Sequence, residues 1–339
     1  MSARTVWKSF RYRLEAWVCR GLVAGVPRLS RGACVNLANA LGSLAAKVDR
    51  RGWRVDMENL ACAMPHLSLQ ERARIVKASY LNFVRTMLDL FWGQNLRADT
   101  WKRWVRTTGV EEYLAEEAQR KTGTIFLCVH YGNWEWALLM AGLLDHPLMV
   151  VAENFKNPLL TDIFNRLREH TGCTVIAQEQ SLLRMLRVVK RGGCTGMLVD
   201  LNLRPTQAAT VVESFGRPGL EMCVPLLHSV LADRADAALV PFTAEHEADG
   251  TCHLRVHPRV PVAPGASLQE ITQACWNAFE PIVKAQPERW LWPYKHFRYL
   301  PKEAARAYPS YAHRSGRYEK LRRTWAGMLG RTESPTAGN

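Results

Sequence analysis

The stretch T-I-F-L-C-V-H-Y-G-N-W-E-W-A-L-L-M-A-G-L-L at residues 124–144 decides the fold. Its first six residues are apolar or β-branched and predict a short buried strand over 124–129. The apolar run over 134–144 predicts a helix. Gly132 and Asn133 form the turn between them, and asparagine is a favoured residue at the start of a helix. A buried strand that leads directly into a helix is the repeating unit of an α/β sheet.

The same alternation continues along the chain. The pattern predicts further strands over 147–152, 173–177, 196–199, 237–242 and 252–257, and helices over 158–170, 181–191 and 220–232. Capping-box sequences, S-L-Q-E, predict that two more helices begin at Ser68 and Ser267, and the first extends to Trp92. We therefore predict an α/β fold with a largely parallel mixed sheet flanked by helices, preceded by an N-terminal helical region.

The composition is that of a globular protein with a strongly uneven charge. Of the 339 residues, 47% are hydrophobic and 22% are charged, which excludes a disordered or collagen-like chain. The formal net charge is +14. Residues 1–54 hold 11 basic and 2 acidic side chains, and residues 284–339 hold 12 and 4, while the middle is slightly acidic. Two basic ends suit nucleic acid, an anionic membrane surface or an acidic protein partner.

The nine cysteines form no C-x-x-C pair, and their number is odd. This pattern argues against a disulfide framework and against a zinc ribbon, and it favours a reducing compartment. His253 and His257 share one face of a predicted strand, but no third ligand is evident near them. We expect neither a metal nor a cofactor.

The N-terminal segment combines aromatic residues with arginines at helical spacing. Two interpretations remain open: a helix lying in a membrane interface, or a helix packed on the protein core. Because charges interrupt its apolar stretches, we expect neither a signal peptide nor a spanning helix. We predict three regions: membrane-associating helices over 1–60, an α/β domain over 61–301, and a basic, flexible tail over 302–339.

His130 and Glu135 are the candidate reactive pair. His130 follows a predicted strand at the edge where α/β sheets bind ligands, and Glu135 lies in the first turn of the next helix. A carboxylate on an apolar helix is costly to bury unpaired, and a histidine one turn away supplies a partner. The second ring nitrogen is then free to accept a proton. In the other interpretation, His130 only ends a strand and Glu135 offsets the helix dipole.

The motif H-Y-G-N-W-E resembles the His-x4-Asp/Glu motif of the glycerolipid-type acyltransferases. The wider pattern resembles one branch, the bacterial lipid A biosynthesis (lauroyl/myristoyl) acyltransferases. Matching segments follow in order from about residue 15 to 301: N-L-A-C-A-M-P at 59–65, K-N-P-L with a later R-x3-G at 156–172, G-G to Asp at 192–200, S-F-G-R-P at 214–218 and P-E-R-W-L-W at 287–292. The ordered set is far more specific than the histidine motif alone.

The resemblance implies that a fatty acyl chain moves from an acyl thioester to a hydroxyl of a lipid, without an acyl-enzyme. The donor is acyl carrier protein or coenzyme A, and the acceptor is a lipid A precursor or a lysophospholipid-like lipid. His130 would be the general base and Glu135 its orienting partner. The implied location is the cytoplasmic face of the bacterial inner membrane, on an anionic surface.

Four further residues are expected to bind substrate. Arg168 could hold a phosphate or lie on a solvated helix face, and Asp200 could be a site residue or a loop cap. Asn133 and Lys156 lie in the matched motifs. The sequence departs from the branch at Glu153, where an arginine is common, and at 293–296. We therefore predict an acceptor simpler than the bis-phosphorylated lipid A precursor.

A second class of function is a non-catalytic basic module that binds lipid or nucleic acid. The aromatic and basic residues over 290–298 could stack on bases or lie in a membrane interface. We favour the enzyme and expect no nucleic acid partner.

Overall fold

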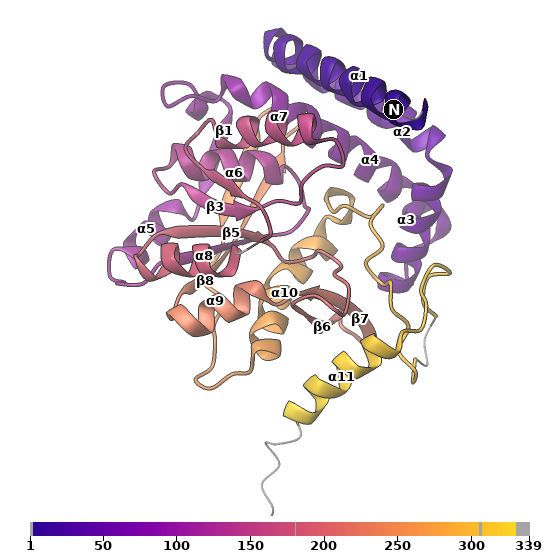
Figure 1. Ribbon diagram of the computed structural model, residues 1–339, viewed down its shortest axis with the longest axis vertical. Helices are drawn as coiled ribbons and strands as arrows, with labels where there is room; N and C mark the ends of the chain where they lie inside the picture. The colour runs from indigo at the N-terminus through magenta and orange to yellow at the C-terminus, as the bar shows by residue number, and fades with distance from the viewer. Residues whose placement is uncertain (1–2, 180, 305–306, 330–339) are drawn as a thin grey trace, which may run out of the picture.

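A computed structural model describes residues 3–179, 181–304 and 307–329. Its centre is a seven-stranded sheet with the order β1-β9-β8-β2-β5-β3-β4 (Figure 1). Every neighbouring pair is parallel except β8 and β9, so the predicted largely parallel mixed sheet is confirmed. The strands are β1 (Val105–Thr108), β2 (Thr124–Cys128), β3 (Leu148–Val151), β4 (Thr174–Ile176), β5 (Cys194–Leu198), β8 (Ala238–His246) and β9 (Cys252–Val256).

Helices cover both faces of the sheet and bury a separate core on each (Figure 1). Along β2, Ile125 and Leu127 belong to one core while Phe126 and Cys128 belong to the other, as the alternation of a strand requires. The helices of the first core include α8 (Ser181–Lys190), α9 (Leu227–Ala235) and α10 (Leu268–Ala285); those of the second include α6 (Trp134–Leu143) and α7 (Pro158–Glu169). The eight-residue helix α5 (Val110–Glu117) lies beside β9.

The N-terminal quarter is helical, as predicted. Helices α1 (Ala3–Gly25), α2 (Arg31–Val48) and α3 (Arg50–Ala63) lead into the long helix α4 (Leu69–Trp92). The predicted capping box is present: Ser68 Oγ accepts from the Glu71 amide at 3.2 Å, and Glu71 Oε2 accepts from the Ser68 amide at 2.7 Å. Because the backbone amides of Ser68 and Glu71 both find a side-chain acceptor, α4 begins where the sequence predicted.

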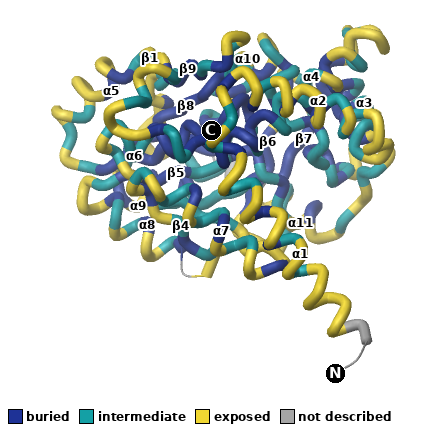
Figure 2. Tube along the Cα trace, turned by 90° about the horizontal axis from the view of Figure 1, so that it is seen from above, coloured by how far each residue is buried: buried dark blue, intermediate teal, exposed yellow. Residues whose placement is uncertain are grey.

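Helix α1 is exposed along most of its length (Figure 2), and its exposed side carries an apolar stripe. Ala16 and Cys19 are buried, and α1 contacts α7. The exposed stripe consists of Val6, Trp7, Phe10, Leu14, Trp17 and Val18, with Trp17 72% exposed. Among the described residues, no helix combines the length and the apolarity that crossing a membrane requires.

The helix predicted over 220–232 is partly wrong. Residues Arg217–Pro225 form strand β7, which pairs antiparallel with β6 (Ala209–Ser214), and the helix begins only at Leu227. The run L-E-M-C-V has period two: Leu220, Met222 and Val224 join one core, while Cys223 packs in another cluster. This alternation belongs to a strand, and an apolar run this short is easily taken for a helix.

The predicted flexible tail also needs correction, because residues Gly316–Leu329 form helix α11. Tyr318 is fully buried, and its hydroxyl donates to Glu221 Oε2 at 2.6 Å. Arg322 forms an ion pair with the same carboxylate at 2.8 Å. These contacts fix α11 to the β6–β7 hairpin. Residues 330–339 lie outside the described part of the chain, and the predicted division at residues 60 and 301 stays a prediction.

Candidate active site

His130 lies just beyond the carboxyl end of β2, and the carboxylate of Asp200 holds it from the neighbouring strand. His130 Nδ1 lies 2.9 Å from Asp200 Oδ1, and the His130 backbone amide donates to Asp200 Oδ2 at 2.9 Å. Asp200 follows β5, which runs parallel to β2. Both residues therefore leave their strands at the same edge of the sheet, where ligands bind in parallel α/β folds.

The pairing determines which ring nitrogen is available for chemistry. Burial by itself raises the pKa of the fully buried Asp200, but the interactions with His130 outweigh it and lower that pKa below its ordinary value. Asp200 is thus an ionised acceptor, and Nδ1 carries the proton that it accepts. In neutral His130, Nε2 then keeps its lone pair. The His130 side chain is 16% exposed, so a substrate can approach it.

The segment P-E-R-W-L-W closes the site from a distant part of the chain. Trp290 is fully buried, and its indole Nε1 donates to Asp200 Oδ2 at 2.8 Å. The Leu291 amide donates to the His130 carbonyl at 2.9 Å, and the Gly132 amide donates to the Arg289 carbonyl at 2.9 Å. Asp200 therefore accepts three hydrogen bonds, and the turn after β2 is fixed on both sides.

His296 supports Trp290 from behind and is a second buried histidine near the pair. Its ring stacks on Trp290 with centroids 3.9 Å apart, and its Nε2 lies 2.8 Å from the Leu291 carbonyl. Burial lowers the pKa of His296 to about 4, so it is neutral at physiological pH. It fixes the indole without adding charge.

Glu135 does not contact His130 as predicted; it pairs with Arg168. Arg168 Nε donates to Glu135 Oε2 at 2.9 Å, and Nη2 donates to Oε1 at 2.5 Å. The Glu135 side chain is nearly buried, at 3% exposed, while that of Arg168 is 20% exposed. The fork of a guanidinium matches two carboxylate oxygens, and Arg168 on α7 can reach Glu135 on α6 because these helices pack together. Nη1 of Arg168 makes no hydrogen bond with the described residues and is available to a ligand.

Asn133 begins helix α6, as the sequence predicted, but nothing in the geometry supports a substrate-binding role. Its Oδ1 accepts from the Trp136 amide at 3.1 Å, and its Nδ2 donates to Asp89 Oδ2 at 2.9 Å. The side chain is fully buried and both of its polar groups have protein partners. It therefore anchors the turn that presents His130.

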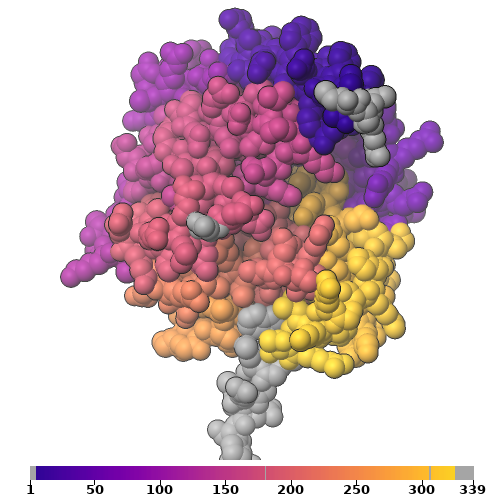
Figure 3. Space-filling view, in the orientation of Figure 1, coloured from indigo at the N-terminus to yellow at the C-terminus, as the bar shows by residue number. Residues whose placement is uncertain are grey.

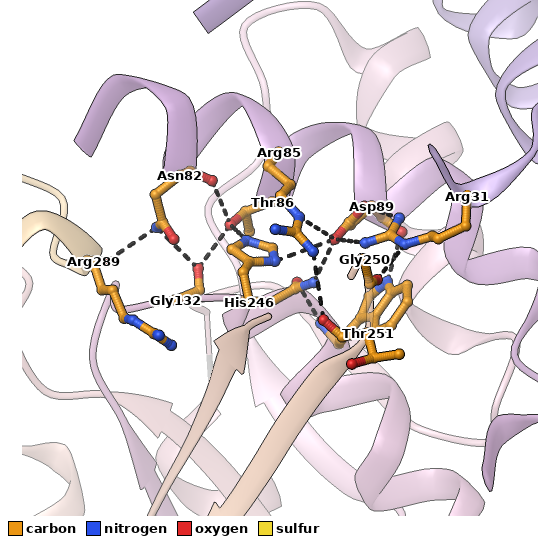
Figure 4. A network of polar contacts seen from close by, with 12 residues as sticks. Arg31, Asn82, Arg85, Thr86, Asp89, Gly132, His246, Gly250, Thr251 and Arg289 are labelled. Atoms are coloured by element: carbon orange, nitrogen blue, oxygen red, sulfur yellow. Dashed lines mark hydrogen bonds and ion pairs between the residues drawn. The ribbon is translucent and has the colours of Figure 1, made fainter. Parts of the chain in front are cut away.

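Asp89 is the centre of the buried network beneath that turn (Figure 4). Arg31 binds both of its oxygens, with Nη2 at 2.8 Å from Oδ2. Arg85 and His246 also face it, at 4.0 Å and 3.4 Å. The Arg31 guanidinium lies 4.8 Å from the centroid of the Trp136 ring. Buried charges require this degree of pairing.

Helix α4 also holds the backbone of the turn directly (Figure 4). Thr86 Oγ1 donates to the Gly132 carbonyl at 2.7 Å and lies 3.0 Å from His246 Nε2. Gly132 has a φ of 58°, and a side chain there would meet the Ala244 carbonyl. Glycine is therefore required at this position.

The sequence alone did not reveal several of these residues. Asp89, Thr86 and His246 carry no recognisable motif, and the contact between Trp290 and Asp200 joins segments 90 residues apart. Lys156, predicted to bind substrate, is exposed in the loop before α7, and its role stays a prediction.

Two groups of metal-ligand types lie elsewhere: Glu117, His146 and Cys194, and Glu245, Glu247 and His253. In the second group, Arg255 and Arg289 pair with Glu245, and Arg106 pairs with Glu247. In the first, Glu117 accepts from the Tyr113 hydroxyl and lies 3.5 Å from His146. Neither group includes His130, and we assign no metal to them.

Comparison with known proteins identifies the family to which the chain belongs. Residues 5–299 match the family described as bacterial lipid A biosynthesis acyltransferase. The chain is also 24% identical over 299 residues to the lipid A biosynthesis lauroyltransferase of Escherichia coli (strain K12). This alignment covers 86% of the present chain and 93% of the lauroyltransferase. The match spans nearly every element described above, including both strands that carry His130 and Asp200. This chain is therefore an acyltransferase, and it belongs to the bacterial lipid A biosynthesis acyltransferase family.

Proposed function

We propose that the protein transfers a fatty acyl chain from an acyl thioester to a hydroxyl of a lipid A-type acceptor, with His130 as general base and Asp200 as its positioning residue. The 2.9 Å contact between His130 Nδ1 and Asp200 Oδ1 carries the proposal, because it leaves Nε2 as the proton acceptor. The family and the lauroyltransferase relative support the reaction class and the acceptor.

In this reaction, the acceptor hydroxyl oxygen attacks the thioester carbonyl carbon while His130 Nε2 takes the hydroxyl proton. The tetrahedral intermediate then collapses, the carbon–sulfur bond breaks, and the leaving thiolate receives the proton from His130. No covalent acyl-enzyme forms. Positioned acid–base catalysis of this kind contributes about 10²- to 10⁴-fold.

Glu135 takes a different role from the one expected from the sequence. Because both of its oxygens accept from Arg168, it fixes the guanidinium rather than the imidazole. We assign Arg168 to an anionic group of donor or acceptor, which its free Nη1 can contact. Arginine suits both roles, because its planar guanidinium can pair with a buried carboxylate and bind a phosphate.

We further propose that the enzyme works at a membrane surface and uses acyl carrier protein as donor. The exposed apolar stripe of α1 is bordered in sequence by Lys8, Arg11, Arg13 and Arg20, a combination that favours an anionic lipid interface. The same net charge of +14 favours an acidic carrier protein.

An assay of the purified protein tests the proposal. Acyl carrier protein and coenzyme A thioesters are each offered with two acceptors, a lipid A precursor and a lysophospholipid, and products are read by mass spectrometry. We expect the highest kcat/KM with the carrier-protein thioester and the lipid A precursor. Transfer to the lysophospholipid alone would instead support the simpler acceptor suggested by Glu153, and no transfer with any pair would refute the proposal.

A further inference from the structure

A basic hollow lies on the surface between helix α3 and the segment after Trp292. It has a volume of about 340 Å³, and its lining includes Arg50, Arg51 and Arg54 from α3 and Lys295 from the C-terminal segment. Figure 3 shows that these parts of the chain, purple and yellow, border each other at the right edge of the molecule. Two segments far apart in the sequence thus bring four cations to one concave surface.

The cations of this hollow have no acidic partners among the described residues. None of the four takes part in an ion pair there. The carboxylate in the lining, Glu58, is already occupied: Ser310 donates to it through its amide at 2.7 Å and through its hydroxyl at 2.8 Å. Four cations against one carboxylate leave the lining with a net charge of +3, which attracts an anion.

The hollow is also a built feature, because buried hydrogen bonds fix its two walls together. Asn59, fully buried on α3, donates to the carbonyls of Trp292 and Tyr294, both at 2.8 Å. Its Oδ1 accepts from the Tyr311 hydroxyl, and the Tyr311 ring lies 5.0 Å from Lys295 Nζ. These bonds hold the backbone of the two walls together, so α3 and the C-terminal segment present their cations to the same hollow.

An exposed apolar stripe ends beside the hollow. Leu37, Leu41, Leu44 and Val48 recur at steps of four, three and four along α2, and all are exposed, Val48 by 67%. This spacing places them on one face of the helix. Val48 ends α2, and Arg50 begins α3 two residues later. An apolar stripe that leads to a cluster of cations matches the order of acyl chains and phosphates in a lipid layer.

From these observations we infer that the hollow of Arg50, Arg51, Arg54 and Lys295 binds the phosphate of an anionic lipid headgroup, and that the α2 stripe contacts the acyl region beside it. The site is separate from His130, and it goes beyond the proposed reaction because it requires only a membrane surface. Arginine suits this ligand because its fork binds phosphate oxygens in pairs.

Vesicle binding by the full-length protein tests the inference. The probe is phosphatidylcholine vesicles containing a minor fraction of phosphatidic acid, and the variant is Arg50→Gln/Arg51→Gln/Arg54→Gln. The matched control, Arg184→Gln/Arg187→Gln/Lys190→Gln, removes the same charge from exposed positions of α8. We expect the hollow variant to bind at least about tenfold more weakly than wild type, and the control within about twofold. Circular dichroism confirms that both variants fold.

Two further arms identify the ligand. Replacing phosphatidic acid by a fatty acid at equal surface charge should weaken wild-type binding, because a carboxylate offers fewer acceptor oxygens. Equal losses in both triple variants would overturn the inference in favour of diffuse charge. The inference would also be overturned if the hollow variant bound vesicles like wild type but no longer bound inorganic phosphate or acyl carrier protein that the wild type binds. These binding measurements do not depend on acyl transfer, so a failed activity assay leaves them interpretable.

Discussion

Replacing Asp200 by asparagine removes one charge from the centre of the site with little change of shape. Asp200 accepts from His130 Nδ1, the His130 amide and Trp290 Nε1. An asparagine carries one acceptor oxygen and one donor nitrogen, so its amide group must face at least one of these three donors. If it faces Nδ1, the ring moves its proton to Nε2 and cannot act as a base.

The size of the effect follows from these contacts. Loss of a hydrogen bond to a charged acceptor costs about 1.5–3 kcal/mol of folding free energy. For catalysis, the wrong tautomer removes most of the general-base contribution, and we expect kcat/KM to fall about 10²- to 10⁴-fold. That fall corresponds to about 3–5 kcal/mol of transition-state stabilisation.

The assay compares Asp200→Asn with Glu221→Gln, which makes the same chemical change at a nearly buried carboxylate that Tyr318 and Arg322 bind. Both variants should lose stability in urea, but only Asp200→Asn should lose activity per folded molecule. Wild-type kcat/KM in folded Asp200→Asn would refute the assignment of Asp200 to His130.

The pH dependence of the unfolding free energy tests the role of the Asp200 carboxylate independently of activity. The folded-state pKa of Asp200 is lowered, chiefly by His130 acting against burial. Its contribution to stability is therefore complete above the ordinary pKa of about 3.9 and is lost as pH falls through the lower folded-state pKa. We expect the difference in unfolding free energy between wild type and Asp200→Asn to shrink in that acid range and to stay constant near neutrality.

Three further predictions concern other buried groups. Arg168→Lys keeps the charge but cannot make both bonds to Glu135. We therefore expect KM for one substrate to rise about tenfold with a smaller change in kcat, and an effect on kcat alone would contradict the binding role. Arg31→Leu leaves Asp89 without its main partner and should cost about 3–5 kcal/mol in chemical denaturation, and a neutral result would show that the network is dispensable. Asp56 is fully buried, its oxygens have no partner among the described residues, and burial raises its pKa to about 9. Above the ordinary pKa, the unfolded chain releases this proton and the folded chain keeps it, so the stability of the wild type falls as pH rises. The unfolding free energy of Asp56→Asn relative to wild type should therefore increase by up to about 1.4 kcal/mol per pH unit between about pH 4 and about pH 9. A pH-independent difference would contradict the raised pKa.

The local elements of the fold could be predicted because their signals are short in range. The capping box at Ser68 and the strand before His130 lie within a few residues of the structure they specify. Strand β7 was mistaken for a helix because its short apolar run fits either element, and the pairing with β6 that distinguishes them is a tertiary contact. Helix α11 was missed because its packing depends on Glu221, about 100 residues earlier.

The site was predictable only in part for the same reason. His130 and Asp200 each follow a buried strand, which a sequence can reveal, but their contact depends on β2 and β5 being neighbours. Strand order is set by tertiary packing. Glu135 was the nearest carboxylate in sequence, yet the geometry of α6 and α7 gives it to Arg168 instead. Proximity along the chain was therefore a poor guide to the partner of His130.

In the proposed reaction, His130 removes the proton of the acceptor hydroxyl. Single-turnover acyl transfer by His130→Ala, measured beside wild type with the same thioester and lipid acceptor, tests it most directly. We predict a loss of about 10²- to 10⁴-fold with the fold and vesicle binding retained. Transfer by folded His130→Ala at the wild-type rate would contradict the account.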